Sequence, residues 1–231
     1  MSVKNQFSKY AKEYKNHNII QQIVAKSLIR ELKYQPKRIL ELGCGSGQVF
    51  NHITWDIEFY KAIDFSSSMC ELHPKGENIE VKCFDFDTQE FLDEIKDNSY
   101  DIVLSSSALQ WSKDLSKIIK QLSLITNEIN AVLFTSNTFK TIQKITNTKS
   151  PILDENSIKE AFSKYFTCEF ETILYKLEFD NKKDLFDYIK KSGVSGGNAS
   201  LNFADAKKLY KEYNLNYLEF EVIFVKTISK L

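Results

Sequence analysis

Short apolar runs alternate with amphipathic stretches over the first 136 residues of the chain. The runs predict five strands, at 38–42, 59–64, 78–83, 100–104 and 130–136. The stretches between them predict helices at 48–55, from about 66, at 88–96 and at 114–125. A strand followed by a helix, repeated in this way, is typical of parallel strands joined by right-handed crossovers. We therefore expect an α/β fold.

The pattern changes after residue 136. Helices are predicted at 154–165, 182–191 and 203–213, and long strands at 168–179 and 218–228. A glycine-rich loop at 192–198 lies between the last two helices. Two long strands at the end of the chain, separated by an insertion, favour an antiparallel hairpin that closes the sheet.

The N-terminal segment predicts a helix at 5–33. Its apolar stripe, spaced by three and four residues, consists of Ala25, Leu28, Ile29 and Leu32. Three aromatic side chains further upstream share one face: Phe7, Tyr10 and Tyr14. These rings either belong to the core or form a lid that places Tyr14 over a ligand.

Glycine is concentrated after the first predicted strand. Three of the seven glycines, Gly43, Gly45 and Gly47, stand at alternate positions shortly after Glu41. Glycine permits sharp turns and a close approach of a ligand to the backbone. The spacing is not the G-x-G-x-x-G of dinucleotide-binding proteins, and the Gly-Lys-Ser/Thr of a phosphate-binding loop is absent. The stretch is either a structural turn or a ligand-binding loop.

Acidic residues end the second and third predicted strands. Asp64 stands 23 residues after Glu41, where an acid can accept hydrogen bonds from ribose hydroxyls. Asp85 and Phe86 follow the third strand, and an acid beside an aromatic ring suits an adenine base. The alternative for each acid is a cap on the following helix. Ser105 ends the fourth strand, at the edge where open α/β sheets bind ligands.

Composition restricts the class of protein. The chain has 231 residues, of which 42% are apolar, enough for one large α/β domain. We find no apolar run of membrane-spanning length and no signal peptide, so we expect a cytoplasmic protein. Four widely spaced cysteines without a C-x-x-C pair predict reduced thiols and no metal site: Cys44, Cys70, Cys83 and Cys168.

The net charge is zero, but the charges are unevenly distributed. Residues 1–37 carry eight basic and two acidic side chains, whereas residues 38–111 carry five and fourteen. Either a basic helix lies across an acidic domain, or the basic ends form a docking face for an acidic partner. Neutral overall charge disfavours nucleic acid as the partner, and we expect no membrane partner.

The order of these features resembles the class I S-adenosylmethionine-dependent methyltransferases. The resemblance implies a three-layer, Rossmann-like α/β fold whose mostly parallel seven-stranded sheet has an antiparallel last strand. It also implies S-adenosylmethionine as the cofactor and S-adenosylhomocysteine as the product, without a metal. The implied cofactor-binding residues are Glu41, Gly43, Cys44, Gly45, Gly47, Asp64, Phe65, Asp85, Phe86 and Ser105.

Four segments, in order, carry a narrower resemblance to the malonyl-[acyl-carrier protein] O-methyltransferases of biotin synthesis. They are Phe7-x-x-x-Ala11-x-x-Tyr14 with Gln21-Gln22, then Ser106 to Gln110-Trp111, then Ile189 to Ser195, and finally Asn216 to Phe224. Gly193-Val194-Ser195 departs from the Gly-Ala-Thr usual in that family, and Ser106 replaces an Asn.

This resemblance implies methyl transfer to the free carboxylate of a malonyl thioester on acyl-carrier protein. A carboxylate is ionised at neutral pH, so it needs an orienting group rather than a general base. Lys190 is the first candidate and the Tyr14 hydroxyl the second, with Gln110 and Trp111 lining the acyl end. Lysines expected to face the acidic carrier are Lys182, Lys183, Lys190, Lys191, Lys207, Lys208 and Lys211.

We expect residues 1–36 to form an N-terminal helical lid and residues 37–231 to form the methyltransferase domain. Residues 182–215 are expected to form a helical insertion on the substrate side. Two alternatives stay open. One is a methyltransferase of the same class that acts on another small carboxylic acid or small molecule. The other is a non-catalytic module that binds S-adenosylmethionine.

Overall fold

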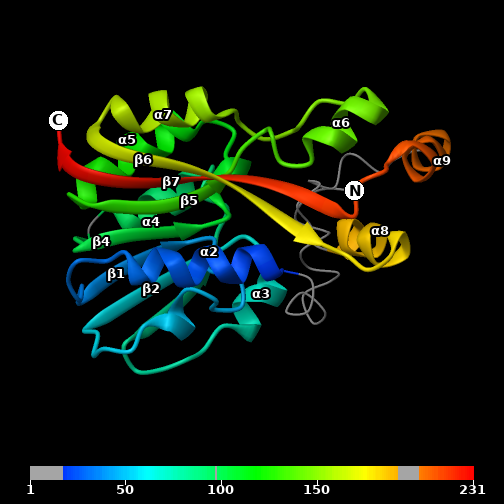
Figure 1. Cartoon of the computed structure of the whole chain (residues 1–231). Coiled ribbons are helices and arrows are strands. Elements are labelled where there is room, and N and C mark those ends of the chain that lie inside the picture. Colours follow the sequence, from blue (N-terminus) through cyan, green and yellow to red (C-terminus); the bar gives the residue numbers. More distant parts are fainter. Residues whose placement is uncertain (1–17, 97, 192–202) are drawn as a thin grey trace.

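The computed structural model describes residues 18–96, 98–191 and 203–231 (Figure 1). Within these ranges seven strands form one sheet, in the order β3-β2-β1-β4-β5-β7-β6. β1 to β5 run parallel, and β7 is antiparallel to both of its neighbours. The strands are β1 (Arg38–Leu42), β2 (Phe59–Asp64), β3 (Ile79–Cys83), β4 (Ile102–Ser106), β5 (Ile129–Phe134), β6 (Phe166–Glu178) and β7 (Tyr217–Lys230).

Helices lie on both faces of the sheet, which gives three layers (Figure 1). One face is covered by α2 (Ile19–Arg30), and the other by α4 (Gln89–Ile95), α5 (Leu115–Ile125) and α7 (Glu155–Ser163). The other helices of the described part lie toward the end where the parallel strands finish: α3 (Ser67–Leu72), α6 (Lys140–Thr146), α8 (Lys182–Lys191) and α9 (Phe203–Glu212). The predicted three-layer fold with a reversed last strand is confirmed.

Alternating side chains of the central strands build a separate core on each face. Ile39 and Leu40 of β1 are both fully buried, but they point to opposite faces and enter different cores. Every residue of β5 is buried, because helices cover the sheet on both sides. This burial agrees with the continuous apolar run from Ala131 to Phe134 within the predicted fifth strand.

The helices α4, α5 and α7 each begin where a polar side chain accepts a hydrogen bond from a backbone N–H of the first turn. Thr88 accepts from Phe91 at the start of α4, at 3.4 Å. The carboxylates of Asp114 and Asp154 do the same for α5 and α7, each at 2.9 Å. These caps satisfy N–H groups that a helix leaves open, so the predicted starts of these helices agree with the structure.

The helix predicted at 48–55 is wrong. After the glycine turn the backbone forms successive turns and a short 3₁₀ helix, η2 (Phe50–His52). The amides of His52 and Ile53 bond to carbonyls three residues back, which is the tighter 3₁₀ pattern. The segment is short and contains β-branched Val49 and Ile53, and such residues disfavour a regular α-helix.

The helix predicted at 5–33 is wrong in its bounds. α2 begins at Ile19, because the φ angle of −128° at Asn18 is not helical, and it ends at Arg30. The earlier residues of that prediction lie outside the described part of the chain. α2 packs on the sheet over β4 and β5, so a lid remains a prediction for residues 1–17.

β6 and β7 form the predicted antiparallel hairpin at the end of the sheet. They pair from Phe166 with Lys230 to Glu178 with Tyr217, and α8 and α9 are inserted between them. Leu185 of the first inserted helix is buried in the same core as α2, which ties the insertion to the sheet. No helix in the described ranges is long and apolar enough to cross a membrane.

Candidate active site

The loop after β1 turns at three glycines whose φ angles are all positive. These angles are +74° at Gly43, +52° at Gly45 and +88° at Gly47. At two of these glycines a side chain is also excluded, because its Cβ would clash with a neighbouring residue. A Cβ on Gly43 would lie 2.0 Å from the Cβ of Ala108, and one on Gly47 would lie 2.5 Å from the Cδ of Pro74. The loop therefore passes closely between the segment after β4 and the segment after α3.

Asp64, the last residue of β2, is hydrogen-bonded to this loop. Its Oδ2 accepts from the Gly45 amide at 2.9 Å, and its Oδ1 accepts from the Ser66 amide at 2.8 Å. The side chain is 6% exposed, and this burial raises the pKa of Asp64 from 3.8 to about 6, against the lowering effect of the two hydrogen bonds. Since Ser66 precedes α3, the carboxylate contacts both the helix start and the glycine loop.

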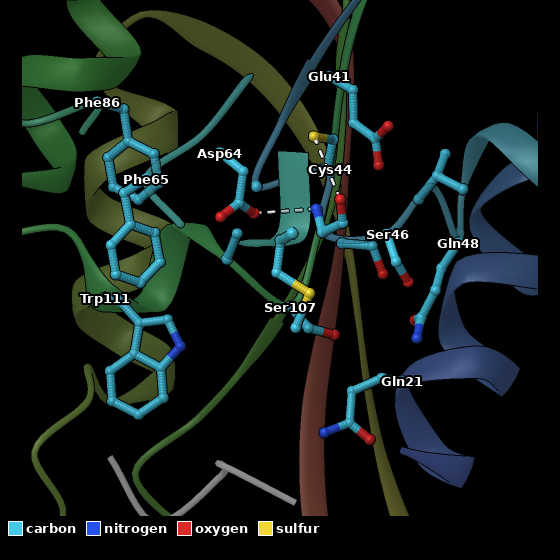
Figure 2. Close-up of a pocket in the computed structure, with 16 residues that line it drawn as sticks. Gln21, Glu41, Cys44, Ser46, Gln48, Asp64, Phe65, Phe86, Ser107 and Trp111 are labelled. Atoms are coloured by element: carbon cyan, nitrogen blue, oxygen red, sulfur yellow. Dashed lines mark hydrogen bonds between the residues drawn. The ribbon is translucent and has the colours of Figure 1, made fainter. Parts of the chain in front are cut away.

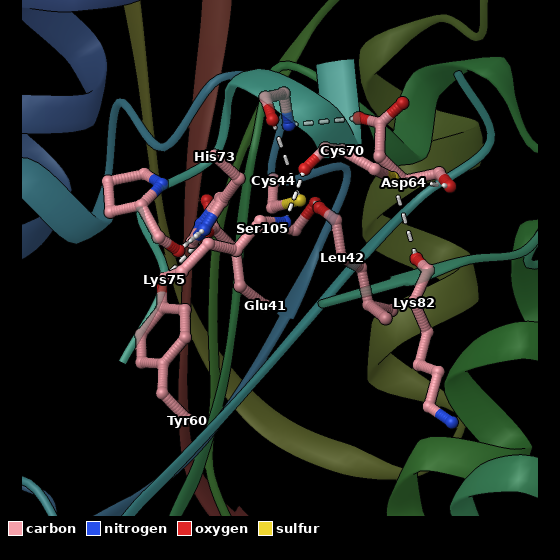
Figure 3. A network of polar contacts seen from close by, with 12 residues as sticks. Glu41, Leu42, Cys44, Tyr60, Asp64, Cys70, His73, Lys75, Lys82 and Ser105 are labelled. Atoms are coloured by element: carbon pink, nitrogen blue, oxygen red, sulfur yellow. Dashed lines mark hydrogen bonds and ion pairs between the residues drawn. The ribbon is translucent and has the colours of Figure 1, made fainter. Parts of the chain in front are cut away.

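Glu41 belongs to a buried polar group beneath the loop (Figure 3). The Tyr60 hydroxyl donates a short hydrogen bond to its Oε2, and the Nε2 of His73 lies 3.9 Å from the same oxygen. The side chains of Glu41 and His73 are 1% and 0% exposed. His73 Nδ1 donates to the carbonyl of Pro74 at 2.8 Å, which fixes the ring. Among the described residues, no group of three or more His, Cys, Asp or Glu side chains is arranged to hold a metal ion.

A pocket of about 660 Å³, including its opening, lies at the carboxyl ends of the parallel strands. Figure 2 shows three aromatic side chains, Phe86, Phe65 and Trp111, in a row along one wall. Glu41, Asp64 and the glycine loop lie opposite them. The predicted site residues that line it are Glu41, Gly43, Cys44, Gly45, Asp64, Phe65, Phe86 and Trp111.

Three polar side chains of the pocket lack a hydrogen-bond partner among the described residues. Their buried atoms are the Oε1 of Gln21, the Oγ of Ser107 and the Nε1 of Trp111. Ser107 also has a φ of +61°, a strained value for a residue with a side chain. A buried polar atom without a partner costs about 1–3 kcal/mol, and a ligand that bonds these atoms would remove the cost.

Two predicted site residues, Ser105 and Gln110, do not line the pocket but hydrogen-bond to backbone next to it. Ser105 is fully buried, and its hydroxyl donates to the carbonyl of Leu42 at 2.9 Å, which joins β4 to the end of β1. Gln110 is 3% exposed, and its Nε2 donates to the carbonyl of Ser107 at 2.7 Å. Both side chains hold neighbouring backbone in place, and their predicted contacts with ligands stay predictions.

Four other predicted residues also fall outside the pocket lining or the described part. Gly47 packs against Pro74, and Asp85 is exposed, with its Oδ1 accepting from a backbone amide at 3.0 Å. Tyr14 lies outside the described residues. Lys190 falls on α8, but its side chain also lies outside what the structure describes. The roles proposed for these residues are therefore untested.

Several residues that line the pocket were not predicted from the sequence. They are Gln21, Ser46, Gln48, Val49, Met69, Ser106, Ser107 and Ala108. One signal for Gln21 was available, because it stands four residues before Ala25 on the buried stripe of α2 and is only 3% exposed. A polar residue on the apolar stripe of a helix indicates either an internal partner or a ligand. α2 brings this amide over the sheet and into the pocket (Figure 2).

The fold and the pocket together define a class of protein. A seven-stranded sheet with a reversed last strand, a glycine loop after β1 and an acid at the end of β2 characterise the class I methyltransferase fold. The YcgJ protein of Bacillus subtilis superimposes with a TM-score of 0.66 over 90% of this chain and 99% of that one, at 12% identity. A putative methyltransferase of Bacillus halodurans gives 0.60 over 87% and 96%, at 13% identity. At these identities the likeness concerns the fold.

Sequence comparison agrees with this class. Residues 40–127 match the family model of a methyltransferase domain. The malonyl-[acyl-carrier protein] O-methyltransferase of Bacillus cereus is 24% identical over 220 residues, covering 85% of this chain and 81% of the relative. The protein of the same name from Bacillus cytotoxicus is 26% identical over 222 residues, covering 85% and 76%. The chain is an S-adenosylmethionine-dependent methyltransferase.

Proposed function

We propose that the protein methylates the free carboxylate of a malonyl thioester carried by an acyl-carrier protein, an early step of biotin synthesis. The observation that carries this proposal is the set of partnerless polar groups on Gln21, Ser107 and Trp111 in the pocket. The names of the sequence relatives support the same substrate.

S-adenosylmethionine suits the loop side of the pocket. Asp64 is the proposed acceptor for the ribose hydroxyls, and Phe65 and Phe86 provide apolar surface for the adenine. The glycine loop leaves room for the methionine end at Gly45, where an added Cβ would meet nothing within 4 Å. When bound, the cofactor supplies a methyl group on a positively charged sulfur.

The acceptor side of the pocket offers neutral hydrogen-bond donors. The indole N–H of Trp111 and the hydroxyl of Ser107 can donate to the two oxygens of a carboxylate, whereas the partnerless Oε1 of Gln21 can only accept, so Gln21 can donate only through its Nε2. No Lys, Arg or His occurs among the described residues of the lining. Neutral donors orient a carboxylate and leave it a better nucleophile than a close ion pair would. Orientation of two bound reactants can supply roughly 7–11 kcal/mol of the barrier reduction.

A carrier protein also needs a docking surface. α8 and α9 lie beyond the carboxyl ends of the strands (Figure 1). Lysines with exposed or half-exposed side chains on these helices are Lys182, Lys183, Lys207, Lys208 and Lys211. Attraction between such lysines and an acidic carrier is screened by salt. Turnover of the carrier-bound substrate is therefore expected to fall as ionic strength rises.

The test is transfer of a labelled methyl group from S-adenosylmethionine to malonyl-carrier and acetyl-carrier protein in parallel. We expect labelling of the malonyl form alone, because only that form has a free carboxylate. Gln21→Leu is expected to raise the KM for the malonyl carrier and to leave cofactor affinity nearly unchanged. Gln22→Leu is the matched control, since Gln22 is the next residue on α2 and is exposed outside the pocket.

Other outcomes would contradict the proposal. Equal labelling of the acetyl form would exclude the carboxylate as acceptor. Efficient labelling of free malonate, with none on the carrier, would favour the alternative of a small carboxylic acid substrate. Cofactor binding without transfer to any acceptor would favour the non-catalytic module.

A further inference from the structure

Three cysteines from separate elements gather where β2 ends. Cys44 lies in the glycine loop, Cys70 on α3 and Cys83 at the end of β3. The Cys44 amide and the thiols of the other two donate to carbonyl oxygens at 3.0, 3.5 and 3.6 Å. These carbonyls belong to three consecutive residues, Ile63, Asp64 and Phe65.

Cys70 is the middle member of this thiol cluster. Its Sγ lies 3.6 Å from the carbonyl oxygen of Lys82, the residue directly before Cys83. The thiols of Cys70 and Cys83 donate to the carbonyls of the consecutive residues Asp64 and Phe65, so the two sulfurs meet the same stretch of backbone. Figure 3 shows Cys44 and Cys70 beside Asp64, between the glycine loop and the end of β3.

The cluster runs from the surface to the pocket. Cys83 is exposed, Cys70 is 8% exposed, and Cys44 is 2% exposed and lines the pocket. A small oxidant therefore reaches Cys83 first, and Cys70 is the next sulfur inward. Cys168, the other cysteine of the chain, lies apart from this cluster on β6.

The neighbouring thiols also affect which sulfur ionises. The Cys44 side chain lowers the pKa of Cys70, while Cys70 and burial raise the pKa of Cys44 well above its usual value. The thiolate is the nucleophile in thiol–disulfide exchange, so Cys70 is suited to the second attack, which closes the disulfide after the exposed Cys83 has reacted with the oxidant.

We propose that Cys83 and Cys70 are an oxidant-sensitive pair, which closes into a disulfide and thereby weakens binding of S-adenosylmethionine. The oxidant class is a low-molecular-weight disulfide, such as oxidised glutathione. The Cys83 thiolate attacks one of its sulfurs, breaks the S–S bond and releases one glutathione thiolate. The Cys70 thiolate then attacks the Cys83 sulfur and releases the second. The protein loses two protons and two electrons, and the oxidant becomes two thiols.

A disulfide would change the cofactor side of the pocket. The two sulfurs must approach to about 2.05 Å, closer than any hydrogen bond between thiols allows. The movement falls on α3 and the end of β3, and it breaks the contacts that the two thiols make with the carbonyls of Asp64 and Phe65. Asp64, Phe65 and Met69, the neighbour of Cys70, contribute side chains to the pocket. Cofactor affinity is therefore expected to fall several-fold.

The experiment exposes the full-length protein to oxidised glutathione and maps disulfides by mass spectrometry of non-reduced peptides. We expect a linked Cys70–Cys83 pair in the unaltered protein and in Cys168→Ser, but not in Cys83→Ser. Calorimetry of S-adenosylmethionine binding should show weaker affinity after oxidation and recovery after reduction with dithiothreitol. Cys83→Ser should bind the cofactor like the reduced protein and should not respond to the oxidant.

Three results would overturn the proposal. They are the absence of a linked Cys70–Cys83 pair, a linked pair with unchanged cofactor affinity, and modification of Cys168 as fast as that of Cys83. The last result would make the cluster no more reactive than a half-buried thiol whose pKa is raised to about 11 by burial. The readouts need no methyl acceptor, so failure here is separate from failure of the proposed substrate.

Discussion

The carboxylate of Asp64 and the backbone amide of Gly45 lie 2.9 Å apart, which joins the end of β2 to the glycine loop after β1. Parallel pairing of β1 with β2, in the register Leu42 to Ile63, brings the two strand ends side by side. The acid is thus held at the loop before any ligand arrives. Because the same acid is buried, its pKa is raised, and the pH dependence of ligand binding can be measured.

The first prediction concerns pH. Burial raises the pKa of Asp64 to about 6, so the folded ligand-free protein holds this proton more tightly than the unfolded chain. The protonated Asp64 therefore contributes most to the stability of the fold below its usual pKa of 3.8, and this contribution is lost as the pH rises through about 6. Ribose hydroxyls would favour the ionised form, so affinity for S-adenosylmethionine should rise between about pH 5 and about pH 7.5. Calorimetry at both pH values measures it.

Asp64→Asn supplies the control for this pH dependence. The amide cannot ionise, so cofactor affinity should be weaker and nearly independent of pH over the same range. A pH dependence as steep in the variant as in the unaltered protein would assign the effect to another group.

The second prediction ranks the three loop glycines. Gly43→Ala and Gly47→Ala each meet a close contact in addition to a positive φ, whereas a Cβ on Gly45 meets nothing within 4 Å. Gly45→Ala should therefore lower the free energy of unfolding only by the cost of placing a side chain at a positive φ, about 1–2 kcal/mol. The other two variants should lose more stability, and Gly43→Ala should lose the most. Chemical denaturation measures the order, and equal losses would show that the contacts relax without cost.

The third prediction concerns the buried Glu41 group. Tyr60→Phe removes a hydrogen-bond donor from a carboxyl that is 1% exposed, so the free energy of unfolding should fall by about 1–3 kcal/mol. Tyr100→Phe is the matched control, because the Tyr100 hydroxyl is also buried but has no hydrogen-bond partner among the described residues. That variant should be neutral or slightly more stable. Denaturation curves with equal losses for both variants would contradict the assignment.

The fourth prediction separates the two tryptophans. Trp111→Phe keeps an aromatic wall but removes the partnerless N–H in the pocket, so transfer to the malonyl carrier should fall at least several-fold with cofactor affinity nearly intact. The Trp55 indole instead donates to the carbonyl of Pro36 at 2.9 Å, outside the pocket lining. Trp55→Phe should cost about 1 kcal/mol of stability and leave transfer unchanged. Steady-state kinetics on both variants provide the comparison.

Local patterns predicted most of the sheet. The apolar runs of β1, β2 and β5 and the alternating runs of β6 and β7 gave strands near their observed positions, because strand burial leaves a direct trace in the sequence. The prediction at 48–55 failed because the segment between two strands was expected to be a regular helix. The close approach of Gly47 to Pro74 and the short span of the segment instead accompany turns and a 3₁₀ helix.

The site divides in a similar way. Glu41, Gly43, Gly45 and Asp64, which line the pocket, were predicted as site residues because strand ends and glycine spacing are local features. Gln21 was not predicted to contact a ligand, because its place in the pocket depends on how α2 crosses the sheet. Ser105 and Gln110 were expected at ligands but hydrogen-bond to backbone carbonyls, and these partners come from packing between elements.

The sequence by itself determined the succession of the seven strands along the chain, the glycine loop and the acid at the end of β2, because each depends on residues that are neighbours in the chain. Only the tertiary structure decided which polar atoms meet and which are left without a partner. Cys70 beside Cys83, and Gln21, Ser107 and Trp111 around one pocket, are arrangements between separate elements. Their geometry follows from strand register and helix packing, which the linear pattern constrains without fixing individual contacts.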